Sequence, residues 1–93
     1  MKNSLIIIFL FAANMIFAQT NAVSGNVTAD GEPIPGVSIL EKGTTNGTIS
    51  DIDGNFKIEL IKSPSVLVFS MIGMLAQEKT VSAGDNVNVA LEE

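Results

Sequence analysis

The stretch DIDGNFKIEL, residues 51–60, decides the fold of this chain. It contains Asp53-Gly54, an Asp-Gly pair of the kind that favours a tight hairpin turn. After the turn, apolar and polar residues alternate from Asn55 to Leu60, with Phe56 heading the apolar set. A period of two predicts a β-strand with one buried face.

The same pattern of turn and alternating segment recurs along the chain, which predicts an all-β sandwich or barrel. The apolar run 66–72 predicts a central strand buried on both faces. Pro33 and Pro35 are predicted outside any ladder, where a missing N–H donor does no harm. Seven strands are expected, at residues 22–28, 36–42, 47–51, 55–61, 66–71, 75–81 and 86–91.

The N-terminus is much more apolar than the rest of the chain. Of the first 18 residues 14 are apolar, and Lys2 precedes the apolar run. This arrangement is typical of a secretory signal peptide, here residues 1–18, with a helical apolar segment and cleavage between Ala18 and Gln19. The alternative is an uncleaved anchor, although the run is short for a spanning helix. The mature domain is then 19–93, and it is exported.

Composition excludes several classes of function. The chain has 93 residues, a formal net charge of −5, no Cys, no His, no Trp and no Tyr. It therefore lacks disulfides, thiolate metal sites and the commonest general base. Its few lysines cannot form the basic face that a nucleic-acid-binding protein needs.

Five motifs follow one another in a fixed order. They are VSGNVT (23–28), GEPIPGV (31–37), KGTTNGT (42–48), DIDGNF (51–56) and LVFSMIG (67–73). Over residues 21–92 they resemble the carboxypeptidase-regulatory-like domain, a transthyretin-like β-sandwich. In particular, they resemble the version at the N-terminus of SusC/RagA-type TonB-linked outer-membrane transporters.

The resemblance implies a seven-stranded antiparallel Greek-key β-sandwich of the prealbumin type. The residues that match its motif have structural roles: Gly25, Pro33, Gly36, Gly43, Asp53, Gly54, Phe56, Phe69 and Gly73. Gly36 and Gly43 are expected at turns or bulges that a side chain would crowd. Met71 and Met74 stand where the family usually has Tyr, which keeps packing but loses the phenol hydrogen bond.

The acidic turn offers two candidate sites, which we weigh against a solvated hairpin. Asp51, Asp53 and Asn55 alternate as calcium ligands do, but Gly54 and Lys62 occupy positions where an EF-hand loop needs other residues. Asp51 and Asp53 also form a carboxylate pair, without the pocket that glycosidase chemistry requires. We therefore predict no metal site, no cofactor and no catalytic residue here.

Three further patterns have ordinary structural explanations. Lys62-Ser63 and Ser38 with Lys42 pair a serine with a lysine, but neither lies in a nucleophile elbow. Asn26 and Asn46 begin N-glycosylation acceptor patterns, which have no expected role in a bacterium. The run Met71–Leu75 is expected to be core and strand end, with an exposed contact patch for a partner as the alternative.

The expected function is that of a non-catalytic interaction module. The resemblance implies a periplasmic or outer-membrane-associated setting in a Gram-negative bacterium, with a protein partner in the cell envelope that belongs to a transporter. The relatives continue into a plug and a barrel, so the chain is expected to be a truncated or split relative. The alternative is a stand-alone secreted sandwich that binds a small ligand or glycan, for which the chain offers few stacking aromatics. An enzyme is not expected.

Overall fold

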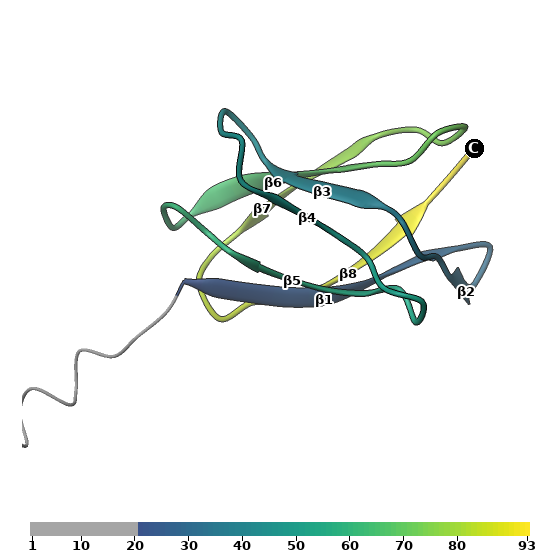
Figure 1. The fold of residues 1–93 in the computed structure, drawn as a ribbon, viewed down its shortest axis with the longest axis horizontal. Helices are drawn as coiled ribbons and strands as arrows, with labels where there is room; N and C mark the ends of the chain where they lie inside the picture. Colours follow the sequence, from purple (N-terminus) through teal and green to yellow (C-terminus); the bar gives the residue numbers. More distant parts are fainter. Residues whose placement is uncertain (1–20) are drawn as a thin grey trace, which may run out of the picture.

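The computed structural model describes residues 21–93, which form eight β-strands in two layers (Figure 1). The strands are β1 (Ala22–Ala29), β2 (Glu32–Pro33), β3 (Ser38–Glu41), β4 (Gly47–Ile49), β5 (Asn55–Glu59), β6 (Ser65–Ser70), β7 (Gln77–Val81) and β8 (Asn86–Leu91). The predicted all-β sandwich is confirmed, with eight strands in place of seven.

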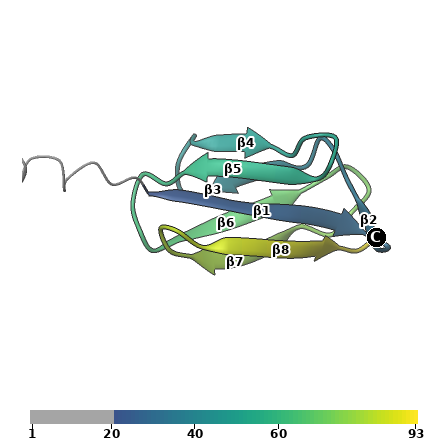
Figure 2. The ribbon, with the colours of Figure 1, turned by 90° about the horizontal axis from the view of Figure 1, so that it is seen from below.

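Each layer is one four-stranded sheet. In the first, β1 pairs with β8 along one edge and with β5 and β2 along the other (Figure 2). In the second, the strand order is β4-β3-β6-β7 and all pairs are antiparallel. Adjacent strands of the second sheet are therefore not always adjacent in sequence, because the chain crosses between the layers after β2, β4, β5 and β7.

The additional strand, β2, contains Pro33, so the prediction that Pro33 lies outside any ladder was wrong. Asp30 and Gly31 both have positive φ, 53° and 80°, and they form a two-residue turn between β1 and β2. Pro33 lies opposite Thr28, between the Ala29–Glu32 pair and the hydrogen bond from Ile34 N to the Val27 oxygen (3.1 Å). Its missing N–H therefore falls at a position where β1 needs no donor.

One pairing departs from the expected antiparallel arrangement. Strands β1 and β8 run parallel, with Ser24 opposite Asn86 and Ala29 opposite Leu91. The chain reaches β8 by crossing from the other sheet, and it therefore enters beside β1 in the same direction. A crossover of this kind is what a parallel pair requires, because a tight hairpin joins only antiparallel neighbours.

The core lies between the sheets and consists of the inward side chains of alternating positions. Phe56 on β5 meets Phe69 on β6 across the layers, with ring centroids 5.4 Å apart in an edge-to-face arrangement. Strand β6 is central, but only its odd-numbered side chains are fully buried, so the prediction of burial on both faces was wrong. The buried apolar residues are Val23, Val27, Val37, Ile39, Phe56, Ile58, Leu60, Leu67, Phe69, Val81, Val89 and Leu91.

The predicted signal peptide, residues 1–18, and its cleavage site between Ala18 and Gln19 lie outside the described residues. Within residues 21–93, no helix has the length and apolar character needed to cross a membrane.

The loops divide between the two ends of the sandwich (Figure 1). We call one end the β2 end; it carries residues 30–36, 50–54, 71–76 and 92–93. Hydrogen bonds join these segments: Gly36 N donates to the Ser50 oxygen (3.0 Å) and Leu75 N donates to the Glu92 oxygen (2.7 Å). The opposite end carries residues 42–46, 60–64 and 82–85.

Candidate docking face at the β2 end

The run Met71–Leu75 divides between the core and the surface. Met71 and Met74 are partly buried and pack against the core cluster. Ile72 is 100% exposed and Leu75 is 62% exposed. Gly73, between them, has φ 85°, which lets the chain turn sharply after β6. The two readings of this run thus apply to different residues: the methionines fill the core, and two large aliphatic side chains project outward.

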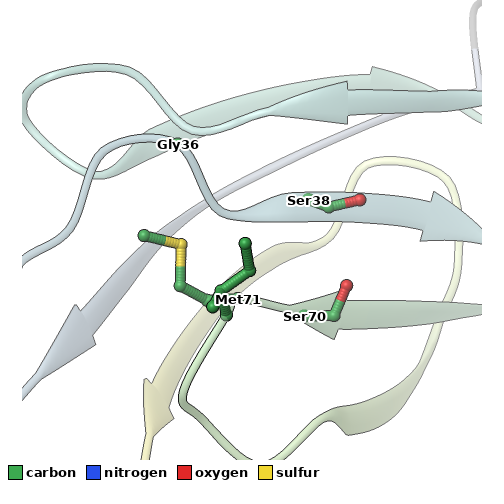
Figure 3. A pocket seen from close by; sticks show the side chains of 5 residues that line it. Gly36, Ser38, Ser70 and Met71 are labelled. Atoms are coloured by element: carbon green, nitrogen blue, oxygen red, sulfur yellow. The ribbon is translucent and has the colours of Figure 1, made fainter.

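A hollow of about 530 Å³ lies beside this turn. Ser38 on β3 and Ser70 on β6 are paired across the sheet, and Met71 follows directly after β6 (Figure 3). Gly36, with φ 78° and no side chain, leaves the adjoining side open. Small residues therefore form much of the hollow, while Met71 and Ile72 contribute apolar walls.

The apolar character continues over the outer face of the second sheet. Ile49 on β4 is opposite Ser38, in the same row as the hollow, and is 66% exposed. In the next row Leu40, 38% exposed, is opposite Val68. An exposed apolar surface of this kind, next to a hollow, is typical of an interaction site.

Charge is distributed unequally between the two ends. Lys42 and Lys62 lie in loops of the opposite end, while Lys57 and Lys79 lie in mid-strand on β5 and β7. Within residues 21–93, then, the loops of the β2 end contain no lysine. They carry six exposed carboxylates: Asp30, Glu32, Asp51, Asp53, Glu92 and Glu93.

The acidic turn uses its polar groups internally. The Asp51 Oδ1 accepts hydrogen bonds from the N–H groups of Asp53 (3.0 Å) and Asn55 (2.9 Å). The Asn26 side-chain amide donates to the Asp53 carbonyl oxygen (2.9 Å) and to the Asn55 Oδ1 (2.8 Å). In the part of the chain that the structure describes, no group of three or more acidic, His or Cys side chains is arranged to hold a metal ion. The Asp51 carboxylate considered for calcium or catalysis thus fixes its own hairpin turn.

The glycine of this turn is held against β1. Gly54 has φ 78°, and a Cβ added to it would lie 2.5 Å from the Val27 carbonyl oxygen and 3.0 Å from the Pro33 Cβ. Val27 also holds this glycine through its backbone N–H, which donates to the Gly54 oxygen (2.8 Å). These contacts pack the Asp53-Gly54 turn and Pro33 against β1 at the β2 end.

The other motif glycines act in different ways. Gly25 has Val87 and the Phe56 ring so close that an added Cβ would overlap the Val87 oxygen and lie 2.8 Å from the ring. Gly36, Gly43 and Gly73 have positive φ but no atoms within 4 Å of an added Cβ. The expectation of crowding at Gly36 and Gly43 was wrong, because these turns need backbone freedom and not space.

One member of each serine–lysine pair, Lys42 and Ser63, interacts with a residue outside the pair. Lys42 Nζ lies 3.1 Å from the Glu78 Oε1 in an exposed ion pair. Ser63 Oγ accepts a hydrogen bond from Ala83 N (2.8 Å). Asn46, the first residue of one glycosylation pattern, donates to the Glu41 Oε1 (2.9 Å) and to the Glu59 carbonyl oxygen (2.6 Å).

Glu41 is the residue that sequence reasoning missed. It is completely buried at the end of β3, and its Oε1 accepts a hydrogen bond from Ile61 N (2.8 Å). Its Oε2 accepts from the Ser65 hydroxyl (2.9 Å) and from Lys62 N (3.3 Å). The Ile61 N–H, assisted by Asn46, Ser65 and Lys62 and opposed by burial, lowers the pKa of Glu41 from 4.5 to about 2. The signal was present: Glu41 continues the inward positions of Val37 and Ile39.

Comparisons with known proteins agree with this architecture. A solved cohesin–X-dockerin complex of Acetivibrio cellulolyticus contains a chain of the same fold, with a TM-score of 0.64 and 18% identity over 76% of this chain and 56% of that one. TonB-dependent receptor P3 of Formosa agariphila is 42% identical over 94 residues, which are 99% of this chain and 9% of the receptor. TonB-dependent receptor SusC of Bacteroides thetaiotaomicron is 43% identical over 79 residues, 84% of this chain and 8% of the receptor.

The chain thus spans less than a tenth of the length of these receptors. The model of the CarboxypepD_reg-like domain matches residues 23–93. This range covers β2 to β8 completely and β1 except for its first residue, Ala22. Family and fold agree, and the chain belongs to the CarboxypepD_reg-like domain family, in the form found in TonB-dependent receptors of the SusC type.

Proposed function

We propose that this chain is a non-catalytic interaction domain of the cell envelope of a Gram-negative bacterium, and that it docks a protein component of a TonB-dependent transport system through the β2 end. The observation that carries the proposal is the completely exposed Ile72 beside a hollow of about 530 Å³. Exposed aliphatic side chains grouped beside a concavity are a common feature of contact surfaces.

The setting comes from the relatives. Receptors that share 42% and 43% identity with this chain are named TonB-dependent receptors. A domain that resembles part of such a receptor is expected to work beside the other proteins of the same transport system. The export that this requires is supported by the N-terminal sequence, which has the pattern of a signal peptide.

A non-catalytic role is supported by how the polar groups are used. The buried carboxylate of Glu41 has both oxygens occupied by internal donors. The Asp51 carboxylate accepts two backbone N–H groups of its own turn. Glu41 is poorly suited to act as a nucleophile or base on a bound substrate, because it is buried and both of its oxygens already accept hydrogen bonds. The Asp51 Oδ1 is likewise engaged within its own turn.

Site-specific photocrosslinking in the native host tests the proposal. A photoreactive residue at position 72 should crosslink to a TonB-dependent receptor or to another subunit of that transport system, identified by mass spectrometry. The same residue at position 61, where Ile61 is 65% exposed at the opposite end, is the matched control. Absence of a transport-system product at position 72, or equal yields at both positions, would count against the proposal.

A further inference from the structure

We propose that the hollow beside Ile72 receives a large apolar side chain from a positively charged segment of the partner protein. This inference rests on the proposed function, because it specifies the chemistry of whatever docks at the β2 end. The lining of the hollow supports an apolar side chain as its occupant, and the negative charge of the β2 end supports a basic segment.

The walls of the hollow favour an apolar side chain. Met71 and Ile72 present aliphatic surface on one side, and Gly36 leaves the other side open. Among residues 21–93, the polar side-chain groups that line it are the hydroxyls of Ser38 and Ser70, both on the floor formed by paired strands (Figure 3). A side chain such as Leu or Phe would exclude water from this surface without leaving a buried charge unpaired.

The negative charge of the β2 end favours a cationic partner. The six exposed carboxylates lie in three segments of the β2 end, residues 30–36, 50–54 and 92–93, and the hollow lies at the same end. The four lysines of residues 21–93 lie elsewhere. Negative charge gathered at one end attracts an approaching basic segment and raises its association rate, and salt weakens this attraction because it shortens the Debye length, which is about 8 Å at physiological salt.

The same charge argues against a second copy as the occupant. Two copies meeting through their β2 ends would bring two sets of six carboxylates together, which is repulsive at moderate salt. A basic partner neutralises this charge where a second copy would double it. The geometry therefore points to a different, cationic protein segment.

Short peptides test the chemistry directly on the chain, purified from the periplasm of an expressing host. The probe is the acetylated, amidated hexapeptide Lys-Lys-Leu-Phe-Lys-Lys. One matched peptide replaces Leu-Phe by Ser-Ser, and another replaces every Lys by Glu. Fluorescence anisotropy should show that the probe binds at least about 10-fold more tightly than either matched peptide.

Variants then locate the binding. Ile72→Ser should weaken probe binding about 10-fold, whereas Ile61→Ser, at a site of 65% exposure on the opposite end, should leave it unchanged. Combining Glu32→Gln with Glu92→Gln should weaken binding about 3-fold at low salt and have no effect at high salt, where exposed charges are screened.

Five results would overturn the inference. Equal binding of the Ser-Ser peptide would mean that only the acidic surface acts, and equal binding of the Glu peptide would mean that charge does not select the partner. Absence of measurable binding, or an equal loss in Ile61→Ser, would show that the hollow is not the site. A homodimer that Ile72→Ser dissociates would assign the face to a second copy. Crosslinking from position 72 to a receptor would survive the first three results, so the proposed function can stand while this inference fails.

Discussion

At the residue scale, Glu41 links three segments that are distant in sequence. Its carboxylate joins the end of β3 to the turn before β4 through Asn46, and to the β5–β6 connection through Ile61 and Ser65. Every donor around it is a neutral N–H or O–H group. A buried carboxylate is stable in such a place only because several donors replace its hydration.

Replacing this carboxylate should expose its role through pH. The folded-state pKa of Glu41 lies at about 2, below its ordinary value of 4.5. Its contribution to stability is therefore complete above pH 4.5 and is lost as pH falls from about 4.5 towards about 2. Urea unfolding between pH 6 and pH 2 should show a flatter pH dependence for Glu41→Gln than for the wild type.

The control for this substitution is Glu59→Gln, an exposed carboxylate on β5. At pH 6, Glu41→Gln should lower the melting temperature several times more than Glu59→Gln, because an amide cannot accept from all four donors. Identical pH profiles for Glu41→Gln and the wild type would contradict the assignment of Glu41 as a charged hydrogen-bond acceptor in the fold.

At the element scale, β1 is the strand on which the first sheet depends, since it contacts β8, β5 and β2. Its close contact with β8 is possible because Gly25 has no side chain. The space above Gly25 holds the Phe56 ring, which in turn packs on Phe69 of the other sheet at 5.4 Å. One glycine therefore sets both the position of a neighbouring strand and the contact between the layers.

Adding a methyl group there should be costly. Gly25→Ala would place its Cβ against the Val87 oxygen and the Phe56 ring, so the strand or the ring must move. Overpacking of this kind lowers the free energy of unfolding by about 1–3 kcal/mol, measured by urea denaturation. Ser24→Ala, one residue away on the other face of β1, should change it by less than about 0.5 kcal/mol. Equal effects of the two substitutions would show that the Gly25 contacts are not limiting.

At the scale of the whole molecule, the charge asymmetry affects stability as well as binding. Six carboxylates lie within the loops of one end, with no lysine among them. Like charges on a small surface repel one another, and this repulsion is relieved when the chain unfolds or when salt screens it. The domain is therefore expected to become more stable as salt is added from a low concentration.

A charge reversal measures this repulsion. Glu32→Lys at the β2 end should raise the free energy of unfolding by about 0.3–1 kcal/mol in 20 mM salt, and the gain should disappear at about 0.5 M salt. Glu59→Lys, near the end that carries Lys42 and Lys62, should give no gain. Thermal unfolding followed by circular dichroism supplies both values. A gain of the same size for both variants would rule out an asymmetric field.

Local patterns predicted the strands well and the surroundings of the strands poorly. The alternation in β3, β5 and β8 placed Ile39, Ile58 and Val89 in the core. The Asp30-Gly31 pair has the composition of a tight turn, but the sequence predicts no strand over the two residues after it, because a proline is unfavourable inside a ladder. Strand β6 is apolar on both faces in sequence, yet one face stays partly open because no strand of residues 21–93 packs over the outer face of the second sheet.

The sequence likewise predicted only part of the candidate site. The apolar run Met71–Leu75 is contiguous, and the sequence offered both core packing and an exposed patch. The hollow is not contiguous, because Ser38 and Ser70 meet only through the pairing of β3 with β6. Nor could the gathering of carboxylates at the β2 end be anticipated, since its members come from three separate segments of the chain.

The sequence by itself determined the element type, the position of the turns and the family, because a period of two and the residues that permit tight turns are local properties. Only the tertiary structure decided the parallel pairing of β1 with β8, the burial of Glu41 and the gathering of six carboxylates at the β2 end. These features depend on which distant segments lie side by side. That choice follows from the common burial of two sheet faces, which no single segment contains.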